Sequence, residues 1–556
     1  MSQRIIVVGG LSAGPSAAAK ARRENENVEI ILFEKSENIS YATCGIPYAL
    51  SGVIPSRDKL LIVEADLLRT RFNIDVRLQE EVLEIFPSKK EVKTSEGVYA
   101  YDKLIFATGA RPVIPPINNI NIATNWSTCR SLGDFDKIMK EGLLDSVSKI
   151  AVLGSGLIGV EVAENIRKLG KEVVIIEGVN QILPMWQPKF SFFAQRELEE
   201  HGVNIYRKTF VNEFVLEGNR AKQLLTSSGE LIDVDFVIVS TGIKPNTELL
   251  VDKGATALEN GALKVNKSME TSLKDIYAAG DNVSIINRQT NKHDYMPLGT
   301  HSNKGGRVAG ANAVGSQEEF KGANKTAIIK VFDYTLARTG LNGKDLQELG
   351  WEYKTNLIIA GATPGYFPDQ KDMIIEIFFD LDNYKIFGAE IFGEIGVDKR
   401  IDVLSTAIYA NLKITDLPHL DLAYAPPFSP AKDPVVVNGL VTSNNVNKTY
   451  DEISVEELKT KLDNNEDIQI LDVRAESEIL TTGTIHPKAI TIDVNSLRDN
   501  LHLLDKDKEI IVNCAKGMRG YLAVRILNHN NFKSVKNLSG GFKVWQMIKN
   551  QVVDKV

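Results

Sequence analysis

The chain has 556 residues, a length that suggests about three or four domains, each with its own core. With 43% hydrophobic residues, 25% charged residues and a net charge of −7, it has a globular composition and no basic excess for general nucleic-acid binding. Its three cysteines are too few for a disulfide framework, and no stretch approaches the roughly 18 apolar residues of a membrane span. The N-terminal MSQRIIVVGG has no long apolar core of the signal-peptide kind. The odd, sparse set of cysteines favours a reducing cytoplasm.

The first predicted unit is a strand, a glycine turn, a helix and a second strand. IIVVGG begins it, an alanine-rich helix follows, and VEIILFEK is the second strand. Gly9, Gly10 and Gly14 let the backbone approach a pyrophosphate at the helix N-terminus, although Leu11 replaces one glycine of the usual G-x-G-x-x-G pattern. Glu34 ends the second strand, where a carboxylate can hold a ribose hydroxyl.

A second unit of the same design begins at KIAVLGSGLIG and has the full glycine pattern. Gly154, Gly156 and Gly159 form its turn, and Glu177 closes its second strand. A carboxylate at that position favours a free 2′-hydroxyl, so we predict NADH rather than NADPH. A single glycine turn also occurs in other α/β proteins, but two copies, each with its acidic residue, indicate two dinucleotides, as in a flavin enzyme reduced by a nicotinamide.

Three further stretches each form a strand that ends in a glycine turn: LIFATGARP (104–112), VIVSTGIKPN (237–246) and IYAAGDNV (276–283). Together with the two glycine turns, they resemble the two-dinucleotide-binding flavoprotein disulfide reductases, from residue 1 to about 440. The resemblance implies that Asp281 contacts the flavin's ribityl chain; the alternative is a helix N-cap. It implies cofactor contacts also from Lys35, Thr108, Gly109, Arg111, Gly242 and Gly280.

The same resemblance implies an α/β chain with two Rossmann-like domains and an α+β dimerisation domain. The FAD domain is expected over 1–112 and 243–325, with the NADH domain inserted at 113–242. Strand-like runs and one helix over 326–442 resemble the interface domain that makes the homodimer. The polar, Asn-rich stretch 443–452 is predicted to be a linker into a separate domain.

Cys44 stands alone in S-Y-A-T-C-G-I-P-Y: the C-x-x-x-x-C spacing of a dithiol fails, because Ser40 stands four residues before Cys44 and no cysteine lies upstream. The segment resembles the single-cysteine branch of the family, which contains coenzyme A disulfide reductases, NADH oxidases and NADH peroxidases. A thiolate is the nucleophile, and a helix starting after Cys44 would favour the anion. The alternative is a buried, inert thiol.

Basic residues on the first predicted helix, and a second basic pair at Arg69 and Arg71, could hold the 3′-phospho-ADP tail of coenzyme A. The resemblance to the coenzyme A reductases implies ligand contacts from six residues: Lys20, Arg23, Ser40, Thr43, Arg71 and Lys432. The alternative for the basic set is a solvated helix face. The resemblance also implies that Tyr424 and Tyr366 reach the cysteine of the partner subunit, and the alternative is interface packing.

One segment departs from the family pattern. PLGTHSNKGGR (297–307) differs from it at Gly299, His301 and Gly305. We interpret His301 as a packing or hydrogen-bonding residue rather than a catalytic base. The third cysteine, Cys129, has no motif and is predicted to be structural.

The last hundred residues carry a second thiol signature. A strand ending in D-V-R is followed by the loop C-A-K-G-M-R, which opens at Cys514 and leads into a helix, and then by GGFKVW. The stretch resembles an α/β rhodanese domain over about 453–550, within a domain predicted at 453–556. Loop amides would stabilise a thiolate or persulfide, and the six-residue loop ending at Arg519 implies sulfur substrates. The alternative is an inactive rhodanese-like module.

These features predict an NADH-driven FAD enzyme that reduces coenzyme A persulfide, polysulfide or coenzyme A disulfide. Cys44 would be the redox nucleophile, and Cys514 would transfer sulfane sulfur. The nearest alternative is an NADH oxidase or peroxidase that cycles Cys44 through sulfenic acid. From another class, the chain could be a sulfur carrier or redox sensor. No metal is predicted.

Overall fold

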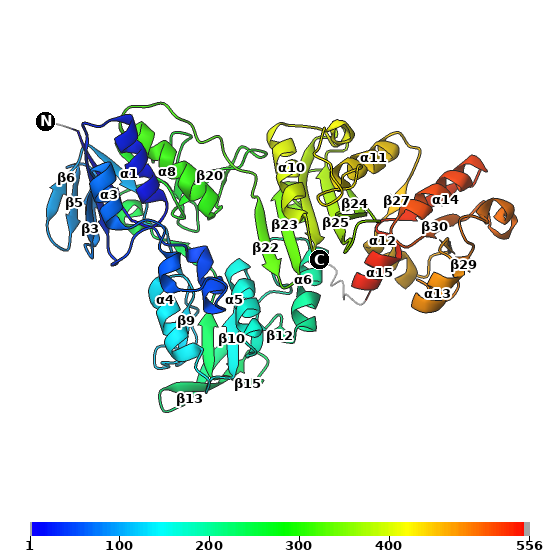
Figure 1. Cartoon of the computed structure of the whole chain (residues 1–556), viewed down its shortest axis with the longest axis horizontal. Coiled ribbons are helices and arrows are strands. Elements are labelled where there is room, and N and C mark those ends of the chain that lie inside the picture. Colours follow the sequence, from blue (N-terminus) through cyan, green and yellow to red (C-terminus); the bar gives the residue numbers. More distant parts are fainter. Residues whose placement is uncertain (1–2, 550–556) are drawn as a thin grey trace. The chain divides into compact units, whose positions relative to one another are not determined.

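The computed structural model describes residues 3–549 (Figure 1). The chain forms two compact units. One contains the residues up to Leu183 together with Leu198–Lys325, and the other contains Pro184–Glu197 together with the residues from Thr326 onward. Among the described residues, no helix is both long and apolar enough to cross a membrane.

The first unit contains a five-stranded parallel sheet in the order β19-β7-β1-β2-β3. Its strands are β1 (Arg4–Val8), β2 (Glu29–Glu34), β3 (Asp75–Leu78), β7 (Lys103–Phe106) and β19 (Ile276–Ala278). Near-continuous apolar runs form these strands because both faces of a parallel sheet are buried. Helix α1 (Ala13–Glu24) packs against α8 (Gly299–Ala313), where a Cβ at Gly310 would lie 2.1 Å from the carbonyl oxygen of Ala17.

A second parallel sheet in this unit has the order β12-β11-β10-β16-β9. Its strands are β9 (Trp126–Thr128), β10 (Lys149–Leu153), β11 (Glu172–Ile176), β12 (Val203–Tyr206) and β16 (Phe236–Val239), with helices α4 (Leu132–Lys137) and α5 (Leu157–Lys168). The chain passes between the two sheets twice. The two connecting segments lie side by side, because β8 (Ala110–Pro112) in the first pairs antiparallel with β17 (Ile243–Pro245) in the second.

Short elements complete the first unit. Three small sheets contain β4 (Val82–Phe86), β5 (Glu91–Thr94) and β6 (Val98–Ala100); β13 (Val211–Glu217), β14 (Arg220–Thr226) and β15 (Leu231–Asp233); and β18 (Leu263–Lys264), β20 (Val283–Ile286) and β21 (His293–Asp294). Around Cys44 lie the 3-10 turns η1 (Thr43–Gly45) and η2 (Arg57–Leu60) and the helices α2 (Ile46–Leu50) and α3 (Ala65–Phe72). A short helix, α7 (Glu248–Val251), follows β17, and a π-helical turn, η3 (Ile138–Gly142), follows α4.

The second unit begins with an antiparallel sheet in the order β22-β23-β26-β25-β24. Its strands are β22 (Ala327–Val331), β23 (Tyr334–Gly340), β24 (Lys354–Gly361), β25 (Asp372–Phe379) and β26 (Ile386–Gly393). Helix α9 (Gly343–Leu349) follows β23, α10 (Val397–Tyr409) packs on β23 and β26, and α11 (Pro434–Val446) packs on β24 and the 3-10 turn η4 (Ile414–His419).

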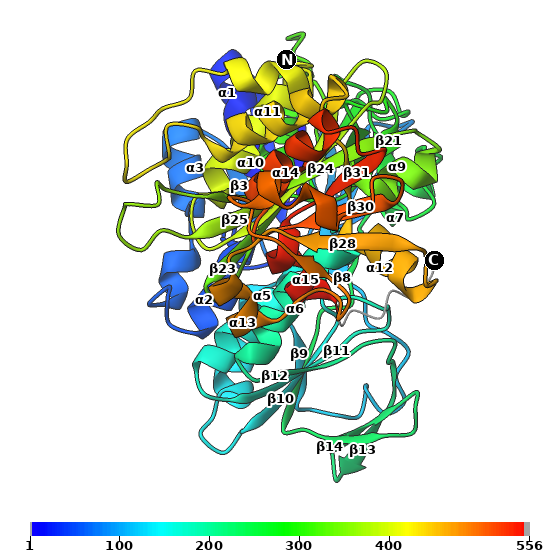
Figure 2. The same ribbon diagram turned by 90° about the vertical axis from the view of Figure 1, so that its right-hand side faces the viewer.

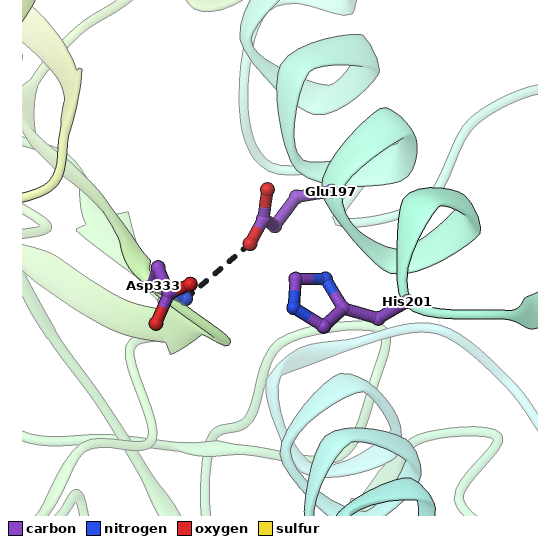
Figure 3. A group of neighbouring side chains, drawn as sticks. All are labelled: Glu197, His201 and Asp333. Atoms are coloured by element: carbon purple, nitrogen blue, oxygen red, sulfur yellow. Dashed lines mark hydrogen bonds between the residues drawn. The ribbon is translucent and has the colours of Figure 1, made fainter.

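Residues 184–197 also belong to the second unit, although they follow β11 in sequence. They include most of helix α6 (Pro188–Glu200), and Glu197 of this helix accepts a hydrogen bond from the backbone amide of Asp333 at 3.3 Å (Figure 3). The backbone amide of Gln187, just before α6, donates to the buried Glu390 of β26 at 3.0 Å.

The rest of the second unit is a parallel sheet in the order β27-β31-β30-β28-β29, with helices around it (Figure 2). The strands are β27 (Glu452–Ile453), β28 (Ile468–Asp472), β29 (Ile490–Thr491), β30 (Glu509–Asn513) and β31 (Ser534–Leu538). The helices are α12 (Val455–Asp463), α13 (Glu476–Thr482), α14 (Met518–His529) and α15 (Gly541–Ile548), with the turns η5 (Leu497–Asp499) and η6 (Leu501–Leu503). The first four residues of the predicted linker belong to α11, whose N-cap is Asp433.

Candidate functional site

The first glycine turn is closed so tightly that side chains do not fit. Gly9 has φ +104°, and a Cβ on it would lie 2.2 Å from the carbonyl oxygen of Ala107. A Cβ on Gly14 would lie 1.8 Å from the carbonyl oxygen of Gly9. Glu34 ends β2 beside the turn and accepts the backbone amide of Gly10 at 2.7 Å. The turn and its carboxylate therefore have the geometry of a dinucleotide site.

The second glycine turn repeats this arrangement between β10 and α5. A Cβ on Gly154 would lie 2.5 Å from the carbonyl oxygen of Ser240, and one on Gly159 would lie 2.1 Å from that of Gly154. Gly156 differs, because no atom lies within 4 Å of its Cβ position, so a pyrophosphate has room to approach the N-terminus of α5. Glu177 accepts the backbone amide of Ser155 at 2.8 Å. The residues present in both turns therefore fit a dinucleotide each.

The segments around Thr108 and Asn246 are joined by hydrogen bonds. The Thr108 hydroxyl donates to the carbonyl oxygen of Asn246 at 2.5 Å, and the Asn246 amide donates to the carbonyl oxygen of Thr108 at 2.9 Å. Arg111 binds Glu248 at 2.6 Å and holds the pKa of that carboxyl near 2. Gly109 and Gly242 stand immediately before the paired strands β8 and β17. Lys35 is exposed and lies 3.8 Å from Glu81.

Asp281 lies at the edge of the first turn. A Cβ on the preceding Gly280 would be 3.4 Å from that of Ala13, the first residue of α1. The Asp281 carboxylate accepts from Arg130 at 2.9 Å and from the Ser302 hydroxyl at 3.2 Å. The N-cap alternative is wrong, because strand β20 rather than a helix follows Asp281.

Cys44 is exposed on a short segment that is fixed to the first glycine turn. The backbone amide of Ser40 donates to the carbonyl oxygen of Gly10 at 2.9 Å, and Ser40 itself has φ +46°. Thr43 and Cys44 lie in η1, and α2 follows at once. All three cysteines of the chain are free, so Cys44 has no partner thiol and is not the buried thiol of the alternative.

The basic residues predicted to bind the ligand differ in their surroundings. Lys20 is only 8% exposed and pairs with Glu24 and, at 2.8 Å, with Glu318. Arg23 is exposed above the ring of Phe72. Arg71 and Lys432 are exposed as well. Lys20 is therefore already neutralised by carboxylates, whereas the three other cations face solvent.

His301 and Cys129 have structural surroundings. Nδ1 of His301 lies 3.0 Å from the carbonyl oxygen of Met296, and burial lowers the pKa of this histidine. This agrees with the predicted hydrogen-bonding role. Cys129 is 5% exposed, and burial raises the pKa of its thiol to about 12, so it is unsuited to act as a nucleophile.

Tyr366 and Tyr424 come together although 58 residues separate them. Their hydroxyl oxygens lie 3.4 Å apart, and the two residues are 73% and 52% exposed. Arg400, which is 1% exposed, holds both loops by donating to the carbonyl oxygen of Ala362 at 3.0 Å and to the Asp433 carboxylate at 3.1 Å. The sequence analysis missed Arg400, which stands beside Lys399 in an amphipathic helix and carries no motif.

Cys514 follows β30, buried at the start of its loop. Its Sγ accepts the backbone amide of Gly517 at 3.1 Å, and its own carbonyl oxygen accepts the amide of Phe542 at 2.8 Å. A Cβ on Gly541 would lie 2.3 Å from that carbonyl oxygen, which explains the glycine of the GGFKVW motif. The amide of Asn513 donates to Asp472 at 3.0 Å, so the residue before Cys514 is fixed to the D-V-R motif.

Charged groups surround the mouth of this loop. Arg519 binds Glu478 at 2.6 Å and holds the pKa of that carboxyl near 2. A cavity of about 500 Å³ lies beside the loop, lined by α13, the loop and α15. Lys516 and Lys543 in its wall both bind Asp372 of β25 at 2.7 Å.

Models of three families match successive parts of the chain. Pyridine nucleotide-disulphide oxidoreductase matches residues 3–298, its dimerisation domain matches 326–434, and the rhodanese-like domain matches 454–548. The two signatures recognised in the sequence thus correspond to separate family models.

Known proteins match most of the chain. Reduced CoADR-RHD from Bacillus anthracis superposes with a TM-score of 0.94 at 36% identity, covering 99% of this chain and 98% of that one. The NAD-dependent persulfide reductase from A. fulgidus gives 0.91 at 36% identity, with 98% and 100% covered. The NAD(P)H coenzyme A polysulfide/persulfide reductase of Pyrococcus horikoshii is 31% identical over 441 residues, which is 79% of this chain and 98% of that protein. The chain belongs to the pyridine nucleotide-disulphide oxidoreductase family and carries a rhodanese-like domain.

Proposed function

We propose that the chain is an FAD-dependent, NADH-driven reductase of coenzyme A persulfide, polysulfide or coenzyme A disulfide. The observation that carries the proposal is the combination of two distinct thiols in one chain. Cys44 is exposed, and its segment is hydrogen-bonded to the first glycine turn. Cys514 is buried, and its sulfur accepts a hydrogen bond from the backbone amide of Gly517. The similarity to persulfide and coenzyme A reductases over nearly the whole length supports the same function.

The two glycine turns have distinct roles. FAD, when bound, supplies the chemistry that passes the electron pair of NADH to sulfur. The turn at Gly9, with Glu34, holds the FAD pyrophosphate and ribose, and Asp281 lies at its edge. The turn at Gly156 holds NADH, because the carboxylate of Glu177 favours a free 2′-hydroxyl over a phosphate.

Cys44 attacks the sulfur–sulfur bond of the substrate as a thiolate. With coenzyme A disulfide, this attack releases one coenzyme A thiolate and leaves a mixed disulfide on Cys44. Two electrons then split that disulfide and regenerate the Cys44 thiolate. Ser40 cannot form the internal disulfide of a dithiol enzyme, so the second sulfur must come from the substrate.

The exposed cations Arg23 and Arg71 bind the phosphates of coenzyme A, with Ser40 and Thr43 along its path. The exposed Lys432 is a further ligand contact. Lys20 contributes only if the ligand displaces one of its two carboxylates. The exposed tyrosine pair serves the Cys44 site of the partner in a homodimer. A reducing cytoplasm suits three free cysteines.

Cys514 accepts sulfane sulfur as a persulfide and supplies it to the Cys44 site. The amide of Gly517 stabilises the anion. Arg519 is paired with Glu478, so it binds an anionic donor only if the donor displaces that carboxylate. The cavity beside the loop gives the donor access.

Steady-state NADH oxidation by the wild type, Cys44→Ser and Cys514→Ser tests this function. The acceptors are coenzyme A persulfide, polysulfide, coenzyme A disulfide, oxygen and hydrogen peroxide. We expect Cys44→Ser to lose activity with every sulfur acceptor, and Cys514→Ser to lose it only with a sulfane-sulfur donor that must first load the rhodanese-like domain. High turnover with oxygen or peroxide that coenzyme A does not affect would instead establish the oxidase alternative. Negligible turnover with all five acceptors would leave a carrier or sensor. Light scattering of the same samples would test the homodimer.

A further inference from the structure

Two lysines in the wall of the cavity beside the Cys514 loop share one carboxylate. Lys516 lies in the loop itself and Lys543 lies on α15, and the ammonium nitrogen of each is 2.7 Å from an oxygen of Asp372. Asp372 begins β25, so it belongs to the dimerisation domain rather than to the rhodanese-like domain. A neighbouring domain therefore supplies the counter-ion for two cations of the rhodanese-like domain.

The carboxylate is the fixed member of this arrangement. The side chain of Asp372 is 12% exposed, whereas those of Lys516 and Lys543 are 48% and 45% exposed. Gln370 also donates to Asp372 at 3.1 Å, and the pairing of β25 with β24 holds its backbone. Because a lysine side chain is long and flexible, the carboxylate determines where the two ammonium groups lie. Without it, both ammonium groups would be free to bind an anion in the cavity.

The other cations at the cavity also have carboxylate partners. Arg519 donates to the two oxygens of Glu478 at 2.6 and 2.8 Å. Arg474 contacts Asp472 at 2.6 Å, and both side chains are almost fully buried. Four cations thus face three carboxylates, so the cavity has little excess positive charge. Its volume of about 500 Å³ has room for an organic group, and the uncharged polar residues described in its wall are Ser477, Thr481, Thr482 and Gln546.

The charge of a sulfur donor matters because the donor must approach the Cys514 thiolate. A protonated persulfide reacts as Cys514–S⁻ + RSSH → Cys514–SS⁻ + RSH: the bond between the two donor sulfurs breaks, the terminal sulfur joins Cys514, and the proton ends on the leaving thiol. Thiosulfate reacts as Cys514–S⁻ + S₂O₃²⁻ → Cys514–SS⁻ + SO₃²⁻, so a dianion must reach the thiolate. A site for thiosulfate therefore needs cations that are free to bind it, whereas a site for an organic persulfide does not.

We propose that Asp372 is a specificity-determining residue of the Cys514 site, because it holds Lys516 and Lys543 and so keeps the cavity from binding small dianions. The donor class that this site takes is an organic persulfide with an uncharged chain next to its sulfur, and not thiosulfate. The inference rests on the proposed function, since it names the donor that loads Cys514. It also gives the dimerisation domain a part in selecting that donor.

The test measures how fast thiosulfate and the persulfide of N-acetylcysteamine load Cys514 in the FAD-loaded full chain, by mass spectrometry of the Cys514 peptide. The readout is the thiosulfate rate divided by the persulfide rate, because a looser loop would change both rates alike. We expect the wild type to prefer the organic persulfide. In Asp372→Asn the ratio should rise about 3–10-fold at low salt, and the rise should shrink in about 0.5 M salt. In Lys543→Gln, which removes a cation, the ratio should fall.

Asp507→Asn is the matched control for the loss of one carboxylate. Asp507 pairs with Lys533 at 2.6 Å and precedes β30, whereas Cys514 follows this strand, so the same change of charge lies at the other end of the strand. We expect the wild-type ratio in this variant. An unchanged ratio in Asp372→Asn, an equal rise in Asp507→Asn, or a wild type that prefers thiosulfate would overturn the proposal.

A second pair of probes separates this proposal from the proposed function. Iodoacetate and iodoacetamide alkylate Cys514 without sulfur transfer, and they differ mainly in one negative charge. The rate with iodoacetate relative to iodoacetamide should rise in Asp372→Asn and stay at the wild-type value in Asp507→Asn. If this ratio rises but neither donor loads Cys514, the proposed function fails and the assigned donor class fails with it. If both donors load Cys514 but neither ratio moves, the proposed function holds and the role of Asp372 is wrong.

Discussion

At the scale of single residues, both thiols owe their surroundings to the backbone of neighbouring motifs. Ser40 donates to the carbonyl oxygen of Gly10, so the Cys44 segment is attached to the turn predicted to bind FAD. The Cys514 carbonyl oxygen accepts the amide of Phe542, so the loop is attached to α15. In each case, a glycine of one motif allows the close approach of another.

Gly541→Ala tests this close approach. Its Cβ would lie 2.3 Å from the Cys514 carbonyl oxygen, and Gly541 has φ +58°, so we expect a loss of about 1–3 kcal/mol in stability of the rhodanese-like domain. Sulfur loading of Cys514, followed by mass spectrometry, should fall several-fold while Cys44 alkylation stays unchanged. Gly483→Ala is the matched control, since Gly483 has φ +77° but no atom within 4 Å of a Cβ. Equal losses of stability in the two variants would show that the positive φ causes the loss, and not the contact with the Cys514 carbonyl oxygen.

At the scale of elements, buried charges connect loops that are distant in sequence. Arg400 of α10 binds Asp433, the N-cap of α11, at 3.0 Å, and both side chains are almost fully buried. Because the same guanidinium reaches Ala362, it fixes the loops that carry Tyr366 and Tyr424.

Arg400→Met should destabilise the second unit by about 3–5 kcal/mol, because it leaves the Asp433 carboxylate buried without its partner. Arg400→Met combined with Asp433→Asn should be less destabilised than the single variant. Chemical denaturation measures both, and a double variant that is no more stable than Arg400→Met would contradict this account.

Glu390 of β26 gives a pH dependence of stability. Burial raises the pKa of its carboxyl to about 7, above the roughly 4.3 of an unfolded glutamate. The folded chain therefore binds the extra proton, and the stability from this group is present below about pH 4 and lost as the pH rises to about 7. Glu390→Gln, which stays neutral, should be more stable than the wild type by about 1–3 kcal/mol at pH 8 and no more stable at pH 4.5. Thermal unfolding of the wild type and the variant at the two pH values measures this difference in stability. A gain in stability seen only at pH 4.5 would contradict the predicted role of Glu390.

At the scale of the whole molecule, the rhodanese-like domain forms one compact unit with the dimerisation domain. Asp372 of β25 binds Lys516 of the Cys514 loop and Lys543 of α15, and these cations hold the pKa of its carboxyl near 2. On α6, Lys189 contacts Glu376 of β25 at 2.7 Å and Glu456 of α12 at 3.6 Å.

Asp372→Asn should loosen the Cys514 loop more than it destabilises the fold. The two lysines are nearly half exposed, so each ion pair is worth less than about 1 kcal/mol. Hydrogen exchange in residues 514–519 should become faster in Asp372→Asn, and 0.5 M salt should produce a similar change in the wild type. The sign follows from the lowered pKa, since the contact is complete above about pH 4 and is lost as the pH falls through about 2. Exchange that is insensitive to both changes would exclude a role for this contact.

The sequence alone determined the two glycine turns with their carboxylates, the unpaired Cys44, the strand–loop–helix at Cys514, and the family with its rhodanese-like domain, which the comparisons confirm. These features follow from local rules, because a turn too tight for a Cβ or a loop before a helix is set by residues close in sequence. Only the tertiary structure decided that Lys20 is paired with two carboxylates, that Asp281 does not cap a helix, and that residues 184–197 join the dimerisation sheet. It also decided the pairing of Asp372 with Lys516 and Lys543 and of Arg400 with Asp433. These outcomes depend on contacts between distant segments, where burial changes what a charged side chain does, and no local pattern records that burial.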